Sequence, residues 1–385
     1  MNRYSEKDGA VQLKGMRLRK TLQQSGLRAP KTLTLALTKA CNLSCSHCWV
    51  DAEDNCSSRH FPRDKAAAMI WEFAELGGEG VRLTGGEPLC HPAWLDLLRL
   101  SVAAGFPTVI LQTNGMLLDD DKIAALRELA FPGFIIQISL DGATPAAHDL
   151  VRGAGSYKEL MAAVDRLVRA GLGPHVSFFF SEMRHNIHEI PAVLRLAEKL
   201  GIGSVATGTL VACGRAAEQL VVPPEPDQYL RLLETFYADP EFRRLYDKLG
   251  TMAALEWRCC DSPRGEGCTF VENPYITSDG RLYPCVLCHA DPYSVTGLTD
   301  KSLAEAFLEG VAIWSALREA SNRRAEENAK CRECSERLTC AGGCLGRAWM
   351  TFGDPMATDD RCELRRAVCG SQSWENLHTV EVCNS

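Results

Sequence analysis

The stretch TLTLALTKACNLSCSHC, residues 32–48, joins an apolar segment to three closely spaced cysteines. Its first part, residues 32–38, predicts a β-strand bounded by a loop. Cys41, Cys45 and Cys48 follow in that loop, after the carboxyl end of the strand. In a parallel α/β barrel this end of the strands is the face on which active sites are built. The stretch therefore predicts the first strand of such a barrel and a thiol-rich functional loop after it.

Short apolar runs and amphipathic segments alternate from about residue 31 to about residue 215. This alternation indicates βαβ units and a parallel sheet. A closed barrel of eight units typically needs about 250 residues, so we expect an α/β fold with a partial, TIM-like (β/α)6 barrel. The expected strands are residues 32–38, 80–84, 108–113, 134–140, 175–180 and 204–210, and the expected helices are residues 63–78, 93–105, 119–130, 157–171 and 187–201.

The chain is expected to divide into four parts. They are an N-terminal extension (1–30), the barrel (31–215), a helical bridge (216–258) and a cysteine-rich domain (259–385). Within the last part, YITSDGRLYPC (275–285) predicts a β-hairpin that turns at Asp279–Gly280. An amphipathic helix or helix pair is expected near residues 302–320.

Composition excludes several classes of protein. The chain has 385 residues and a net charge of −7, so it lacks the basic footprint of a nucleic-acid-binding protein. No apolar stretch is long enough to span a membrane, and the first residues lack the apolar core of a signal peptide. We therefore expect a cytoplasmic protein without a membrane partner. In that reducing compartment its 18 cysteines indicate metal binding or redox chemistry rather than disulfides.

The three cysteines of the first loop are compatible with more than one site. Three thiolates can hold three irons of a cubane cluster and leave the fourth iron open to a substrate or cofactor. A zinc site completed by His47 is an alternative. It is weaker, because His47 lies between two of the ligands and would be hard pressed to reach the same metal. A disulfide is weaker still in this compartment.

The C-x3-C-x2-C spacing of CNLSCSHC (41–48) resembles the signature of the radical S-adenosylmethionine (SAM) superfamily. The resemblance implies that Cys41, Cys45 and Cys48 hold a 4Fe–4S cluster whose open iron binds SAM. An electron from the cluster would then split SAM into methionine and a 5′-deoxyadenosyl radical, which abstracts a hydrogen atom from the substrate. The protein would orient the reactants and exclude solvent.

The segment after the second expected strand, Gly85, Gly86, Glu87 and Pro88, resembles the part of these enzymes that binds the amino group of SAM. Its glycines let the backbone approach a ligand closely. Glu87 offers an acceptor for an ammonium group, and Pro88 fixes the turn. A plain turn before a helix is the alternative interpretation.

Polar residues also follow the later strands. By resemblance, Ser139 would hydrogen-bond the ribose of SAM, and Asp141 would orient that loop. Both could instead be ordinary turn-forming residues at a strand end. Asn186 and Gly214–Arg215 follow the fifth and sixth strands, where relatives also carry polar contacts.

The C-terminal cysteines resemble the SPASM extension of radical SAM peptide maturases, and every gap between them matches that pattern. A zinc ribbon built on the C-x2-C unit at 331–334 would leave the remaining cysteines without a ligand role. The resemblance implies two auxiliary 4Fe–4S clusters, which would make three clusters in all. The first would be bound by Cys268, Cys285 and Cys344, and the second by Cys331, Cys334, Cys340 and Cys362.

The fourth ligand of the first auxiliary cluster is open at this stage. Cys260 is preferred, with Cys259 and Cys288 as competitors. If none of them binds, this cluster has an open iron that could touch substrate. Fully thiolate-ligated clusters cannot bind SAM, so electron transfer is their expected role.

The resemblance implies an enzyme that acts on a ribosomally made peptide and installs a thioether or carbon–carbon crosslink or a similar oxidative modification. Sulfatase maturases carry an aspartate base directly after the hairpin cysteine, whereas Val286 follows Cys285 here. This difference counts against formylglycine formation. Tetrapyrrole side-chain modification, as in the haem pathway, is the alternative. A non-catalytic iron–sulfur or zinc scaffold is more remote, because it has no use for the Gly85–Pro88 segment.

The expected partners follow from the same resemblance. They are a peptide substrate and an electron donor such as flavodoxin or ferredoxin. Residues 1–30 are too short for a winged-helix domain that recognises a leader peptide. Leader recognition would therefore need a separate protein or another surface.

Overall fold

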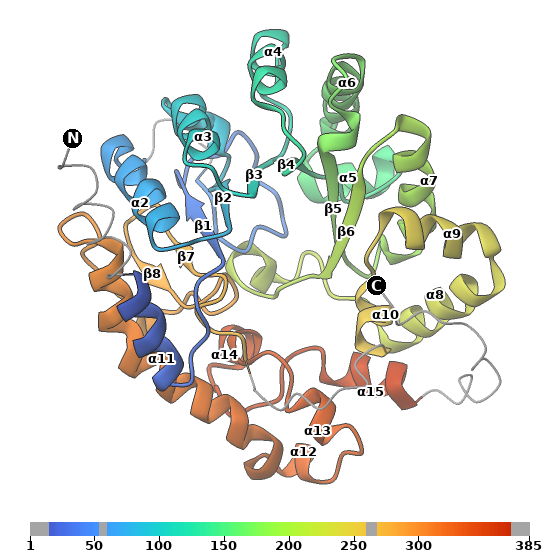
Figure 1. Cartoon of the computed structure of the whole chain (residues 1–385). Helices are drawn as coiled ribbons and strands as arrows, with labels where there is room; N and C mark the ends of the chain where they lie inside the picture. The colour runs from blue at the N-terminus through green and yellow to red at the C-terminus, as the bar shows by residue number, and fades with distance from the viewer. Residues whose placement is uncertain (1–14, 54–59, 259–267, 371–385) are drawn as a thin grey trace, which may run out of the picture.

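The computed structural model describes residues 15–53, 60–258 and 268–370. Its centre is an open sheet with the strand order β6-β5-β4-β3-β2-β1-β7-β8, in which β1 to β6 are all parallel (Figure 1). This arrangement confirms the predicted partial barrel. The parallel strands are β1 (Thr32–Ala36), β2 (Gly80–Thr84), β3 (Thr108–Thr113), β4 (Phe134–Ser139), β5 (Val176–Glu182) and β6 (Ser204–Thr209).

Helices connect the parallel strands and surround the sheet on its outer side (Figure 1). Most of them lie within a few residues of the predicted ranges. The additional helix α5 (Pro145–Arg152) was not predicted from the sequence. The helices of the barrel are α2 (Arg63–Glu75), α3 (Trp94–Ala103), α4 (Asp120–Leu129), α5 (Pro145–Arg152), α6 (Ser156–Arg169) and α7 (Ile190–Leu200).

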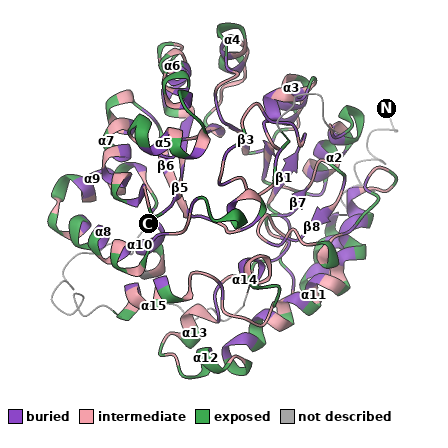
Figure 2. Ribbon diagram, turned by 180° about the vertical axis from the view of Figure 1, so that it is seen from behind, coloured by how far each residue is buried: buried purple, intermediate pink, exposed green. Residues whose placement is uncertain are grey.

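The barrel strands bury one face fully, whereas alternate side chains on the other face, such as Arg82 and Gln137, are only half-buried. Leu33, Leu35, Val81 and Leu83 are fully buried. Figure 2 shows this buried centre between half-buried and exposed outer helices. No helix of the described residues is long and apolar enough to cross a membrane.

The predicted hairpin is present as β7 (Tyr275–Ile276) and β8 (Leu282–Tyr283), which pair antiparallel. Gly280 has a φ of +78° in the turn, a conformation that favours glycine. The hairpin does not stand apart from the barrel. β7 runs parallel to β1, with Tyr275 opposite Thr34, so the hairpin extends the barrel sheet at its β1 edge. The sequence did not predict this pairing, because a two-residue strand carries no period.

In Figure 1 the remaining helices form two groups: α8 to α10 lie beside α7, and α11 to α15 run along the lower side of the molecule. α11 packs next to α2, and the Glu72 carboxylate of α2 accepts hydrogen bonds from Leu303 N at 2.7 Å and Ala304 N at 3.0 Å. α15 packs next to α8 and α10. These helices are α8 (Pro226–Ala238), α9 (Pro240–Leu249), α10 (Ala253–Arg258), α11 (Leu303–Glu327), α12 (Ala329–Arg332), α13 (Arg337–Cys340), α14 (Leu345–Phe352) and α15 (Cys362–Gly370).

A buried arginine ties the C-terminal region to the barrel. Arg347 of α14 is 2% exposed and forms an ion pair with Asp360, with Nε 2.7 Å from Oδ1. Its Nη1 also donates to Thr209 O at 3.1 Å, and its Nη2 donates to Leu210 O at 2.5 Å. One side chain therefore satisfies backbone carbonyls at the end of β6 and fixes the segment around Asp360.

We predict that Arg347→Ala lowers the free energy of unfolding by about 3–5 kcal/mol, because it leaves the Asp360 carboxylate without its buried partner. Denaturant unfolding followed by circular dichroism measures the change. The control is Arg323→Ala, which removes an exposed pair with Glu327 and should cost less than about 1 kcal/mol. Equal losses for the two variants would contradict a special role for Arg347.

Candidate active site

Cys41, Cys45 and Cys48 lie in the loop that follows β1. Cys41 and Cys45 are buried, and Cys48 is half-buried. Burial raises the pKa of Cys41 to about 12 and also raises the pKa of Cys45. A buried thiol becomes a thiolate when a metal or another cationic group stands beside it. This donor set therefore fits a metal cluster, for which thiolates are the usual ligands.

Each of these sulfur atoms has a nitrogen donor beside it. Leu43 N lies 3.4 Å from Cys41 Sγ, and Ala52 N lies 3.3 Å from Cys48 Sγ. Arg152 Nη1 lies 3.9 Å from Cys45 Sγ. Hydrogen bonds to ligating sulfurs are one means by which proteins tune iron–sulfur clusters.

The Gly85–Gly86 turn lies directly against the entrance of the cysteine loop. Gly86 N donates to Thr38 O, and Glu87 N donates to Ala40 O, both at 2.8 Å. A Cβ atom on Gly86 would stand 2.4 Å from Ala40 O, and one on Gly85 would stand 2.5 Å from Thr38 O. The glycines were expected to admit a ligand. In the structure, their lack of side chains also leaves space for the backbone that leads to Cys41.

The Glu87 carboxylate is fully buried and joins the ends of two strands. It accepts hydrogen bonds from Thr113 Oγ1 at 2.6 Å, Asn114 N at 2.7 Å and Leu89 N at 3.1 Å. Burial raises the pKa of Glu87 to about 7, although these hydrogen bonds oppose the shift. The predicted contact with the SAM ammonium group stays a prediction, and the structure adds this internal role. Pro88 begins the short 3-10 helix that follows.

At the end of β4, Ser139 is half-buried and Asp141 is fully buried. Arg152 Nε lies 2.6 Å from Asp141 Oδ2, and Ser181 N donates to Asp141 Oδ1 at 3.0 Å. Burial alone would raise the pKa of Asp141, but the charge of Arg152 outweighs it and holds the pKa at about 2. Asp141 is therefore an ionised residue that organises its loop. The predicted contact of Ser139 with the ribose stays a prediction.

His47 faces Asp141, because its Nε2 lies 3.4 Å from Asp141 Oδ2. Its Nδ1 is buried and has no hydrogen-bond partner. Burial lowers the pKa of His47 to about 4, so the ring is neutral near pH 7. The His47 ring therefore lies against Asp141, and the zinc site completed by His47 stays an alternative prediction.

Gly214 and Arg215, after β6, hold the far end of the cysteine loop. Arg215 Nε donates to Cys45 O at 3.0 Å, and its Nη1 donates to Ala52 O at 2.7 Å. Gly214 has a φ of +57°, and a Cβ atom there would stand 2.5 Å from Cys48 O. These two residues were expected to make polar contacts. In the structure, both residues contact the backbone of the cysteine loop.

Two further polar residues support Asp141. Asn186, which was noted in the sequence, donates to Asp141 O at 3.0 Å. Arg152 was missed because the helix α5 that carries it was not predicted. The available signal was Thr144 followed by Pro145, a typical helix start. Thr144 Oγ1 does accept a hydrogen bond from the backbone of this first turn.

The expected ligands of the first auxiliary cluster lie together. Burial raises the pKa of Cys285 well above its usual value, and the neighbouring thiols Cys288, Cys268 and Cys344 raise it further. Cys259 and Cys260 lie outside the described residues. Within the described ranges, none of these four cysteines forms a disulfide.

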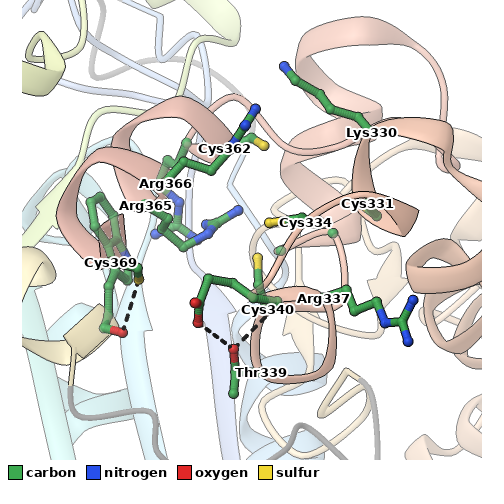
Figure 3. A pocket seen from close by; sticks show the side chains of 15 residues that line it. Lys330, Cys331, Cys334, Arg337, Thr339, Cys340, Cys362, Arg365, Arg366 and Cys369 are labelled. Carbon is green, nitrogen blue, oxygen red and sulfur yellow. Dashed lines mark hydrogen bonds between the residues drawn. The ribbon is translucent and has the colours of Figure 1, made fainter. Parts of the chain in front are cut away.

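The expected ligands of the second auxiliary cluster line one cavity. Cys331, Cys334, Cys340 and Cys362 contribute to its wall, together with Cys369 (Figure 3). The cavity takes these thiols from α12, α13, α15 and the turn between α12 and α13. Cationic side chains complete the lining and suit an anionic thiolate cluster. They are Lys330, Arg337, Arg361, Arg365 and Arg366.

A partial barrel with three thiols after its first strand, and a glycine turn packed against them, defines a radical SAM domain. Residues 35–197 match the profile of the family described as the radical SAM superfamily. This match over the barrel confirms the resemblance drawn from the sequence.

Known proteins resemble almost the whole chain. It is 27% identical over 355 residues to the AdoMet-dependent heme synthase of Methanosarcina barkeri, covering 88% of this chain and 97% of that protein. It is also 27% identical over 345 residues to the PqqA peptide cyclase of Gluconobacter oxydans, covering 87% and 91%. The crystal structure of Streptococcus suis SuiB bound to S-adenosylmethionine matches with a TM-score of 0.69 at 16% identity, covering 91% of this chain and 80% of SuiB. SuiB therefore shares the fold of both the barrel and the C-terminal region.

We predict that Gly86→Ala lowers the free energy of unfolding by about 1–3 kcal/mol, because the added methyl group collides with the backbone before Cys41. It should also weaken SAM binding, since the loop must move away from the turn. Denaturant unfolding and equilibrium binding of SAM to the anaerobic protein measure these effects.

The control is Gly208→Ala in β6, where a Cβ atom would meet Phe179 at an ordinary distance of 3.7 Å. This variant should bind SAM like the wild type. If Gly86→Ala and Gly208→Ala behaved alike, the close contact with the cysteine loop would not matter for SAM binding.

Proposed function

We propose that this enzyme cleaves SAM and abstracts a hydrogen atom from a ribosomally made peptide, in which it installs a thioether or carbon–carbon crosslink or a similar oxidative change. The observation that carries the proposal is the cysteine loop. Its three thiols are held between the turn at Gly86 and the side chain of Arg215, with a nitrogen donor beside each sulfur.

In this proposal Cys41, Cys45 and Cys48 hold the 4Fe–4S cluster that binds SAM. Such a cluster supplies the electron that splits SAM into methionine and a 5′-deoxyadenosyl radical. The chain itself shapes the site: Asp141 and Arg152 fix the loop after β4 against His47. Gly85–Pro88 and Ser139 are the proposed contacts with the amino group and the ribose of SAM.

The C-terminal thiols are proposed to hold two auxiliary 4Fe–4S clusters. Closing a crosslink after hydrogen abstraction removes one further electron from the peptide, and a thiolate-ligated cluster can accept it. A flavodoxin or ferredoxin is the proposed electron donor, and a separate protein or another surface of this chain is proposed to recognise the leader peptide. We place the enzyme in the cytoplasm, where such donors and reduced thiols coexist.

Two relatives support a peptide substrate. The PqqA peptide cyclase is named for a peptide that it cyclises. SuiB, which shares the fold, has been solved with its precursor peptide SuiA. Val286 after Cys285 still counts against formylglycine chemistry, because its side chain cannot act as a base.

Tetrapyrrole side-chain modification is the second candidate. The observation in its favour is the 27% identity to an AdoMet-dependent heme synthase over 97% of that protein's length. The two candidates share SAM cleavage and differ in the molecule from which the radical takes its hydrogen.

We predict that Cys45→Ala abolishes 5′-deoxyadenosine formation, because the SAM-binding cluster loses one of its protein ligands. The iron content should fall from about twelve to about eight per chain if the other two clusters remain intact. Liquid chromatography of the reduced protein with SAM, together with iron analysis, measures both. Cys90→Ala, outside all predicted ligand sets, is the matched control and should keep both values. Full 5′-deoxyadenosine formation by Cys45→Ala would refute the assignment of this loop.

We predict that the reduced enzyme converts a short cysteine-containing peptide encoded beside its gene, with the loss of hydrogen expected for a crosslink. Parallel incubation with porphyrin precursors tests the second candidate. Mass spectrometry distinguishes the two, since a crosslink lowers the mass of the peptide by the hydrogen lost, whereas a side-chain modification changes the mass of the tetrapyrrole. Conversion of the tetrapyrrole alone would overturn the peptide proposal.

A further inference from the structure

Cys288 lies in the loop after β8 and is fully buried. Its backbone N donates to Cys285 O at 3.2 Å, so the two cysteines bracket one tight turn. A buried free cysteine often serves as a small apolar residue. The neighbours of Cys288 argue for more than packing.

Two backbone contacts bring other cysteine-bearing segments to this turn. Val271 N donates to Pro284 O at 2.9 Å, which places the segment after Cys268 beside the start of the turn. On the other side, Gly346 packs so closely that a Cβ atom would stand 2.1 Å from Leu287 O and 3.0 Å from Cys288 N. Gly346 follows Cys344 by two residues, at the beginning of α14.

These backbone contacts bring the segments that carry Cys268, Cys285, Cys288 and Cys344 together around one buried turn. Cysteine thiolates are the usual protein ligands of iron–sulfur clusters.

We propose that Cys288 is the fourth thiolate ligand of the first auxiliary 4Fe–4S cluster, together with Cys268, Cys285 and Cys344. The inference rests on the proposed function, because it requires the auxiliary clusters. It replaces Cys260, which was preferred from the sequence and lies outside the described residues.

The assignment has a consequence for the chemistry. With Cys288 bound, all irons of this cluster have thiolate ligands, so none is open to the substrate. The cluster can then exchange electrons with a substrate radical and cannot coordinate the substrate. Substrate recognition must depend on other surfaces of the protein.

The experiment compares anaerobically reconstituted wild type, Cys288→Ala, Cys288→Ser and Cys260→Ala. Iron analysis and electron paramagnetic resonance (EPR) after mild oxidation are the readouts, with SAM present to occupy the cluster at Cys41–Cys48. Cys288→Ala should lose about four of about twelve irons, or show the EPR signal of a three-iron cluster, because a cluster that lacks one thiolate releases its exposed iron. Cys260→Ala should match the wild type in both readouts.

Cys288→Ser keeps the size of the side chain and guards against a folding defect in the alanine variant. A serine oxygen is a weaker ligand for iron than a thiolate, so the EPR spectrum of the first auxiliary cluster should shift while circular dichroism stays unchanged. Wild-type spectra from both serine and alanine variants at full iron content would overturn the assignment, as would the three-iron signal in Cys260→Ala. A wild type with about four irons would instead refute the auxiliary clusters themselves.

Discussion

The cysteine loop after β1 depends on close backbone contacts at both of its ends, each made through glycine. At the entrance, Gly85 and Gly86 pack against residues 38–40, where a Cβ atom has no space. At the far end, Gly214 packs against Cys48 O, and Arg215 donates to carbonyls of the loop. A loop without regular structure is thereby held with the accuracy that a multi-ligand site requires. The contacts come from β2 and β6, so the barrel itself sets the positions of the thiols.

Strand β1, which leads into the cysteine loop, also pairs with the C-terminal region. β7 pairs with β1, so the hairpin before Cys285 shares the sheet that supports the first cysteine loop. Trp49, next to Cys48, contacts His289 with ring centroids 4.9 Å apart and Tyr275 with centroids 6.0 Å apart. His289 directly follows Cys288. The separation between the first cysteine loop and the first auxiliary thiols is therefore fixed by strand pairing and aromatic packing, which suits electron exchange between fixed sites.

Much of the fold could be predicted from the sequence, because strands and helices of the barrel leave a local period. The cysteine groups could also be predicted, since spacing within a short segment is visible along the chain. Contacts between distant segments could not. The pairing of β7 with β1 rests on two residues, and the ion pair of Arg152 with Asp141 joins two segments that spacing along the chain does not connect.

The glycine motif shows the same limit at a finer scale. Its composition indicated that another group approaches the backbone closely. In the structure, this group is the backbone of the cysteine loop, at Thr38 O and Ala40 O. Spacing likewise favoured Cys260 for the first auxiliary site and left Cys259 and Cys288 as competitors. The packing of α14 against the turn at Cys288 is a tertiary contact, and it distinguishes Cys288 where spacing could not.

The two groups of C-terminal thiols lie in different surroundings, and this difference bears on their proposed roles. Cys288 belongs to the main hydrophobic core, with Leu345 as another fully buried member. In the described part of the chain, the cavity of the second group is lined by five cationic side chains and one carboxylate, Glu336. Nearby cations stabilise the more negative, reduced state of a cluster, whereas apolar burial disfavours it. Under the proposed function, the cationic lining at the second group would therefore favour the reduced state of a bound cluster more than the apolar surroundings of the first group would.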